Sequence, residues 1–117
     1  MTPEKLPRAN EAVVSRTKVV EYLLSHSHPD GQGKARFFNA HGFSEANWEQ
    51  LAAALRSHGT SHAVQEAVET HYEFRYLVEG ALPSPNGRTP RVRTVWFIRA
   101  GYAIPELVTA YPIRRRT

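Results

Sequence analysis

The stretch "RVRTVWFIR" at residues 91–99 decides the fold class of this chain. It is built of β-branched and aromatic residues between arginines, a composition typical of a strand. Successive side chains of a strand point to opposite faces. One face carries Val92, Thr94, Trp96 and Ile98. The opposite face carries Arg93, Val95, Phe97 and Arg99. Trp96 is expected in the core, so Thr94 becomes a partly buried hydroxyl if helices cover that face.

Three neighbouring stretches also have strand character. "AVQEAV" (63–68) and "THYEFRYLVEGAL" (70–82) precede the loop "PSPNGRTP" (83–90), whose Asn-Gly step is typical of a turn. In the second stretch, apolar side chains alternate with charged ones, as in a half-buried strand. "ELVTAYPI" (106–113) is predicted as the last strand, with Thr109 on the same face as Leu107 and Tyr111.

Helical patterns come first in the chain. Residues 11–25 carry apolar side chains at helical spacing, although Ala12 to Val14 could instead form a short strand. A short helix is expected over 34–43, with Gly42 at its C-terminus and Phe43 folding back on its last turn. Ser44 is a good N-cap for a helix over 45–59, which Gly59 is expected to end. Helices followed by consecutive strands predict an α+β fold, with N-terminal helices packed on a C-terminal antiparallel sheet of about four strands.

Length and composition fit a single domain. We expect a flexible lead-in over residues 1–10, one α+β domain over 11–113 and a basic tail over 114–117, in a chain of 117 residues. The absence of cysteine excludes disulfides and thiol catalysis and is compatible with the cytoplasm. The N-terminus lacks the apolar core of a secretory signal, and no stretch is long enough for a membrane span. The net charge of +4 is compatible with a nucleic-acid partner.

Several kinds of site are disfavoured by the spacing of the polar residues. His26 and His28 form an H-x-H pair, but no further ligands stand at a metal-motif spacing, so we expect neither a metal nor a cofactor. No G-x-S-x-G elbow is present. "GQGK" (31–34) lacks both the spacing and the preceding strand of a phosphate-binding P-loop.

Metal-independent acid–base chemistry remains, and RNA is a fitting substrate because its own 2′-OH can attack the adjacent phosphate. Such an enzyme needs a base, an acid, and cations or hydroxyls around the phosphorane. Lys34 is a cation at a helix start, where it opposes the helix dipole, and that unfavourable placement hints at function. The candidate catalytic residues are His28, Lys34, Thr94, Thr109 and Tyr111, and the candidate substrate-binding residues are Arg75, Arg91 and Arg93.

Several stretches together resemble a family of small bacterial and phage-related domains that also occur at the C-termini of polymorphic toxins. They are "KVVEYLLS", "HPDGQGKARFF", "GFS", "YEFRYLVEGAL", "PNGRTPRVRTVWFI" and "PELVTAYP". Such domains look like members of the barnase, EndoU, colicin and RelE-type ribonuclease superfamily. One departure is Glu73, at a position where the resemblance leads us to expect glycine.

The resemblance implies a toxin or effector domain that cleaves RNA without a metal and is neutralised by a cognate inhibitor, an immunity or antitoxin protein. His28 would then be the general acid or base. Lys34 would bind the scissile phosphate or stabilise charge in the transition state, and Thr109 and Tyr111 would donate hydrogen bonds or help position the substrate. Two alternatives stay open from the residues. One is a non-enzymatic binding module, such as an inhibitor or adaptor of phage or bacterial origin, and the other is simple nucleic-acid binding without turnover.

Overall fold

The computed structural model describes residues 5–28 and 32–113. Its elements, in chain order, are η1 (Ala9–Glu11), α1 (Arg16–Lys18), η2 (Val19–Leu23), α2 (Gln32–Ala40), η3 (Glu45–Asn47), α3 (Trp48–Ser61), β1 (Val64–Glu69), β2 (Glu73–Ala81), β3 (Arg91–Arg99) and β4 (Glu106–Pro112). The helices precede the strands, which confirms the predicted α+β class. The expected basic tail at 114–117, the first four residues, and Pro29 and Gly31 of the expected turn lie outside the described residues.

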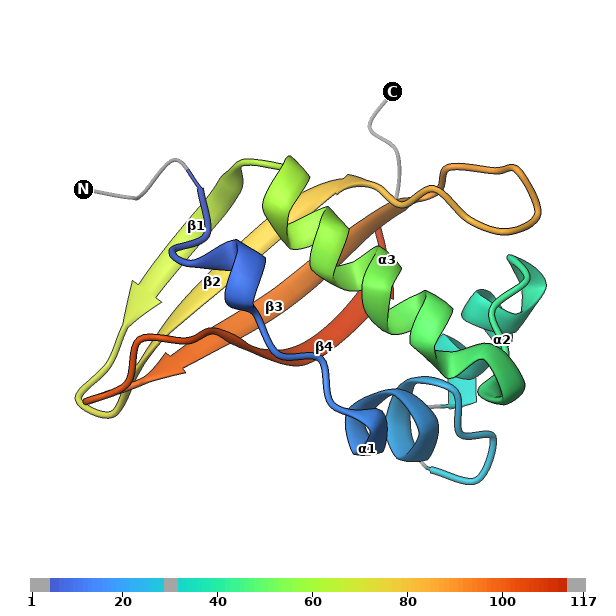
Figure 1. Ribbon diagram of the computed structural model, residues 1–117, viewed down its shortest axis with the longest axis horizontal. Helices are drawn as coiled ribbons and strands as arrows, with labels where there is room; N and C mark the ends of the chain where they lie inside the picture. Colours follow the sequence, from blue (N-terminus) through green and yellow to red (C-terminus); the bar gives the residue numbers. More distant parts are fainter. Residues whose placement is uncertain (1–4, 29–31, 114–117) are drawn as a thin grey trace.

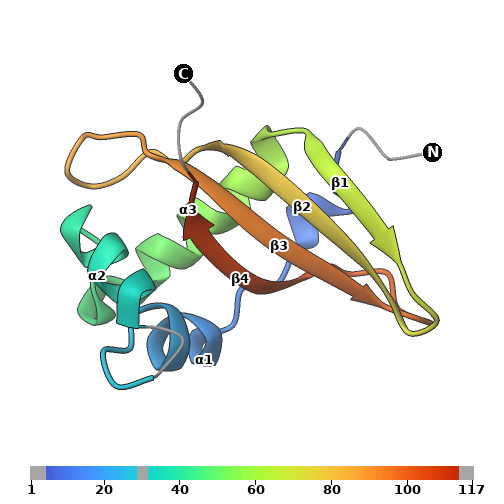
Figure 2. The same ribbon diagram turned by 180° about the vertical axis from the view of Figure 1, so that it is seen from behind.

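The four strands form one antiparallel sheet in the order β1-β2-β3-β4, and α3 runs diagonally across one face of it (Figure 1). We call this the covered face; it holds Val92, Thr94, Trp96 and Ile98 of β3, all buried. The other side of the sheet is the open face, and no helix of the described chain lies over it (Figure 2). The alternate residues of β3 point to this face; they are Arg91, Arg93, Val95, Phe97 and Arg99. β3 spans residues 91–99, as the alternation predicts, and Trp96 is fully buried.

Gly59 does not end the third helix, contrary to the prediction. The helix continues to Ser61, with His62 at its C-cap. A Cβ at Gly59 would stand 2.9 Å from Cζ2 of Trp96, so the glycine is required where the helix backbone approaches the indole ring. A glycine near the end of a helical pattern can serve as a C-cap or as a close-packing site, and here it is a packing site.

The junction after α2 forms as predicted. Gly42 has φ +95°, and the Phe43 N–H donates to the Phe38 carbonyl at 3.0 Å while the Gly42 N–H donates to that of Asn39 at 3.0 Å. This pair of bonds defines a Schellman motif. The rings of Phe38 and Phe43 meet edge to face with centroids 6.2 Å apart, and both are buried in the core.

A β-bulge in β4 overturns the prediction that Thr109 and Leu107 share a face. Leu107 pairs with Trp96, whereas Thr109 pairs with Val95, so the register shifts by one residue between them. Paired residues of neighbouring strands lie on the same face of a sheet. Leu107 therefore lies on the covered face, and Thr109 lies with Tyr111 on the open face.

The N-terminal segment runs along the β4 edge of the sheet. Val13 makes an isolated parallel bridge with Glu106, so the alternative of a short strand at residues 12–14 is reduced to this single bridge. Ser15 caps α1 by accepting from the Lys18 N–H at 3.1 Å. Leu6, which falls within the expected flexible lead-in, is buried in the core. Within residues 5–28 and 32–113, no helix is long and apolar enough to cross a membrane.

Candidate functional site

A cluster of polar side chains surrounds Tyr22, where η2 meets the open face beside β4. The Tyr22 hydroxyl lies 3.1 Å from Oγ1 of Thr109. The His28 ring meets the tyrosine ring edge to face, with centroids 5.0 Å apart. The ammonium groups of Lys18 and Lys34 lie 5.1 and 5.2 Å from the ring centroid. We call these five residues the Tyr22 cluster.

Local sequence features place each member of the cluster. Val19 and Leu23 bury the inner side of the π-helical turn η2, leaving Tyr22 between them, partly exposed. Short π-helical turns often occur at functional sites. Lys18 stands four residues before Tyr22, the spacing at which side chains on one helical turn meet. The bulge in β4 turns Thr109 towards the tyrosine.

His28 and Lys34 flank the segment 29–31, which lies outside the described residues. The His28 N–H donates to Oγ of Ser25 at 3.2 Å, and its carbonyl accepts from the Gln32 N–H at 3.1 Å. Lys34 is in the first turn of α2 and is partly buried. His28 and Lys34 both contact Tyr22, whose hydroxyl meets Thr109, so these three candidates lie around one side chain.

The electrostatics of the cluster favour ionisation of the tyrosine. Burial raises the pKa of Tyr22, but hydrogen bonds from Thr109 and Lys34 and the positive charges of Lys34 and Lys18 together lower it below its ordinary value. A phenol with a depressed pKa can take part in proton transfer. The two ammonium groups and the threonine hydroxyl also form a setting in which an anion such as a phosphate can bind.

Thr94 is not part of this cluster. It is fully buried on the covered face, where its Oγ1 lies 3.0 Å from Nδ1 of His58 and accepts a hydrogen bond of 2.8 Å from Nε1 of Trp96. Nε2 of the same histidine lies 2.9 Å from the Val92 carbonyl. Thr94 therefore links the sheet to α3 within the core, and the candidate site loses this member.

Tyr111 and the candidate arginines lie elsewhere on the open face. Nη1 of Arg93 donates to the Tyr111 hydroxyl at 3.1 Å, and its Nε donates to Glu79 at 2.7 Å. Hydrogen bonds to Tyr111 and to Glu79 raise the pKa of Arg93. Arg75 pairs with Glu73 at 3.0 Å, and Arg91 is exposed at the start of β3. Tyr111 thus holds Arg93 in place, two residues along β4 from Thr109.

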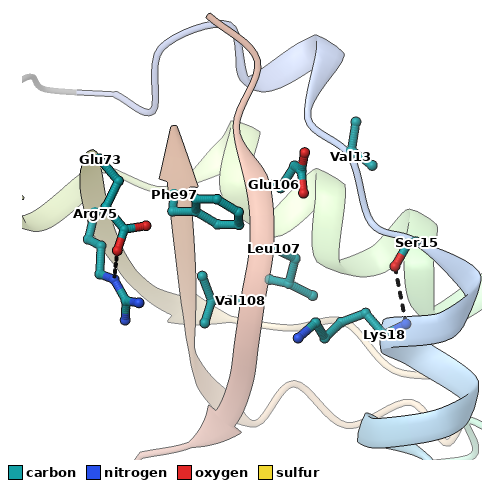
Figure 3. A pocket seen from close by; sticks show the side chains of 9 residues that line it. All are labelled: Val13, Ser15, Lys18, Glu73, Arg75, Phe97, Glu106, Leu107 and Val108. Atoms are coloured by element: carbon teal, nitrogen blue, oxygen red, sulfur yellow. Dashed lines mark hydrogen bonds and ion pairs between the residues drawn. The ribbon is translucent and has the colours of Figure 1, made fainter. Parts of the chain in front are cut away.

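A hollow of about 310 Å³ adjoins the Tyr22 cluster on the open face (Figure 3). Its lining residues are Val13, Ser15, Lys18, Glu73, Arg75, Phe97, Glu106, Leu107 and Val108. The Phe97 ring lies between the Arg75–Glu73 pair and β4, and Lys18 reaches in from the helical side (Figure 3). Lys18 belongs to both the cluster and the hollow, so the two form one continuous polar surface.

Sequence reasoning missed Tyr22 and Lys18. Both lie in "KVVEYLLS", where the buried valines and leucines drew attention to packing alone. A usable signal was present, because Tyr22 sits between two core positions of a helical pattern and follows a lysine by four residues. Among the described residues, no group of three or more His, Asp or Glu side chains is arranged to hold a metal ion.

A protein-family model described as "Domain of unknown function (DUF6883)" matches residues 5–114, almost the whole chain. Neither the curated proteins nor the solved structures contain a match to the chain.

Proposed function

We propose that this chain, which belongs to the family of domains of unknown function DUF6883, cleaves RNA by metal-independent acid–base chemistry at the Tyr22 cluster. The observation that carries the proposal is the Tyr22 hydroxyl itself. It lies 3.1 Å from Thr109, with two ammonium groups and an imidazole packed around its ring. Cleavage through the RNA 2′-OH requires these types of group and no protein nucleophile.

The reaction begins when a base removes the proton of the ribose 2′-OH and the oxygen attacks the adjacent phosphorus. An acid then protonates the departing 5′ oxygen, and a 2′,3′-cyclic phosphate remains on the other fragment. His28 and Tyr22 are the two groups of the cluster that exchange protons in these steps. Their rings are in contact, with centroids 5.0 Å apart, so both can reach one phosphate.

The cations and hydroxyls stabilise the phosphorane as negative charge develops on it. Lys34 and Lys18 approach Tyr22 from α2 and α1, and Thr109 adds a hydroxyl from the sheet. Arg91, exposed at the start of β3, is available for a more distant phosphate of the substrate. In a cell such chemistry would make the chain a toxin or effector domain that acts on cytoplasmic RNA, and its safe production would require a cognate inhibitor protein.

The proposal is tested by incubating the purified protein with total RNA in EDTA. We expect cleavage that leaves 2′,3′-cyclic phosphate ends, and a loss of at least about tenfold in His28→Ala, Lys34→Ala and Tyr22→Phe, since a positioned acid–base group contributes about a hundredfold or more. His26→Ala is the matched control, because His26 is an exposed neighbour outside the cluster that lies 2.9 Å from Asn39. Equal activity of the three variants and the wild type would remove the cluster from the mechanism.

A different outcome would favour the alternative of a binding module. In that case the wild type leaves RNA intact and forms a stoichiometric complex with a partner, and the variants of His28 and Lys34 retain the complex. Growth arrest on expression that is lost in Lys34→Ala would instead support the enzyme.

A further inference from the structure

Two hollows adjoin each other along the open face and share a wall. The first, of about 310 Å³, begins at Lys18 beside the Tyr22 cluster. The second, of about 430 Å³, is lined by Tyr72, Glu73, Phe97, Arg99 and Ala100 and lies towards the end of the sheet where β2 begins and β3 ends. Phe97 and Glu73 line both hollows. The two form a continuous track that leads away from the cluster.

Aromatic surfaces are present along this track. Phe97 pairs with Arg75 on the open face and is partly exposed. Figure 2 shows no helix of the described residues over that face. Tyr72 is 80% exposed and lines the second hollow. The Arg99 guanidinium lies 5.7 Å from the Phe97 ring centroid. Exposed aromatic rings interleaved with arginine are the features on which unpaired nucleobases stack.

The charged side chains that line the track are three cations, Lys18, Arg75 and Arg99, and two carboxylates, Glu73 and Glu106. The excess of cations suits phosphates, and the mixture of signs suits a nucleotide chain with polar bases better than a uniformly charged ligand. Lys18 and Arg99 stand at its two ends and can contact phosphates. Glu73 accepts a hydrogen bond of 3.0 Å from Arg75, so its negative charge is balanced where the hollows meet. Carboxylates beside a stacking surface also accept hydrogen bonds from the amino groups of bases.

We propose that the two hollows hold two consecutive unpaired bases of a single-stranded RNA, with Phe97 as the stacking surface that they share. This inference rests on the proposed function, because it extends the substrate from the phosphate at the Tyr22 cluster. Lys18 provides the connection, since its ammonium lies 5.1 Å from the Tyr22 ring centroid and also lines the first hollow. Bases in a duplex are stacked on each other and cannot reach Phe97, so the substrate class is single-stranded RNA.

The test measures binding separately from cleavage. A fluorescent 2′-O-methyl heptanucleotide, which has no 2′-OH to attack its phosphates, is titrated with the full chain and followed by anisotropy, first single-stranded and then annealed to its complement. We expect the duplex to bind at least about fivefold more weakly than the single strand. We expect Phe97→Leu and Tyr72→Ala each to weaken single-strand binding by at least about fivefold, the low end for loss of one stacking contact.

Phe74→Ala is the matched control. Phe74 is 40% exposed, pairs with Ile98 and therefore lies on the side of the sheet away from the track. Its removal should leave binding unchanged. Tyr72→Ala keeps the test decisive if Phe97→Leu impairs folding, because a side chain as exposed as Tyr72 contributes little to the core.

The two proposals fail in different ways. Equal binding of duplex and single strand, absence of binding, or full binding by both track variants would overturn the inference about the track. Tight, variant-sensitive binding of the 2′-O-methyl strand without cleavage of its ribose counterpart would support the track and overturn the proposed ribonuclease activity.

Discussion

The buried histidine of the covered face should make the protein sensitive to mild acid. His58 is 2% exposed, and its Nε2 lies 3.1 and 2.9 Å from the carbonyls of Gly80 and Val92. Nε2 must therefore carry a proton, which it donates to these carbonyls. Nδ1 of the neutral ring then accepts from the Thr94 hydroxyl at 3.0 Å, while Trp96 donates to the same hydroxyl oxygen at 2.8 Å. The neutral ring is therefore hydrogen-bonded at both nitrogens, to the two carbonyls through Nε2 and to the Thr94 hydroxyl through Nδ1.

The size of the expected change in the free energy of unfolding follows from the pKa of the His58 ring. Burial, then electrostatic interaction with His62 and to a smaller extent with Arg91, lower the pKa of His58 from 6.5 to about 4, although the hydrogen bonds to the Gly80 and Val92 carbonyls act to raise it. Because the folded pKa lies below the unfolded one, the stabilisation is present above pH 6.5 and is lost as the pH falls towards 4. Between pH 7 and pH 5 the unfolded state gains the proton and the folded state does not, which costs about 2 kcal/mol of the free energy of unfolding.

Urea denaturation at a series of pH values measures this loss. The wild type should lose about 2 kcal/mol more than His58→Gln between pH 7 and pH 5, because the other histidines are common to both proteins. The His58 imidazole resonances in NMR spectra should also keep their neutral-ring shifts at pH 5. Parallel stability curves for the two proteins, or a protonated His58 at pH 5, would refute the reasoning from burial.

Three further predictions concern single side chains. Thr94→Val should reduce stability by about 1–3 kcal/mol in urea, since it leaves the Trp96 N–H without its acceptor, while RNA cleavage per folded molecule stays unchanged; a specific loss of cleavage would return Thr94 to the site. Lys34→Gln should raise the pKa of Tyr22, measured as the tyrosinate absorbance that Tyr22→Phe removes, because both the hydrogen bond and the charge of Lys34 lower it; an unchanged titration would contradict that cause. Gly59→Ala should lower the melting temperature, because its Cβ would stand 2.9 Å from Trp96. Gly33→Ala should not lower it, because among the described residues no atom beyond its chain neighbours and its own helix backbone lies within 4 Å of the added Cβ.

The sequence predicted those parts of the fold in which one physical signal dominates. Alternation placed Trp96 on the buried face of β3, and the strand has the expected bounds. Gly42 and Phe43 ended α2 as expected, because a glycine at positive φ followed by an apolar residue satisfies the last carbonyls of a helix. Gly59 was misread because helix termination and close packing leave the same mark in a sequence. Only the tertiary contact with Trp96 distinguishes them.

The candidate site depends on a contact between residues far apart in the sequence, which the alternation of side chains along a strand does not reveal. The sequence predicted His28 and Lys34 as candidates because a loop histidine and a cation at a helix start stand out locally. Tyr22 looked like one more side chain of an apolar helix, since its partner Thr109 lies 87 positions away.

The decisive step is the bulge in β4. A shift of one residue in a strand reverses which side chains face the core. Without it, Thr109 would share the covered face with Leu107, as the period of two predicts, and could not meet Tyr22. With it, Leu107 stays buried on the covered face, while Thr109 and Tyr111 both turn to the open face. Bulges often occur next to functional sites because they redirect a side chain without disturbing the core on either side. This bulge lies between Leu107, which contacts the core, and Thr109, whose hydroxyl meets Tyr22. Its position is therefore an independent reason to place the candidate functional surface on the open face.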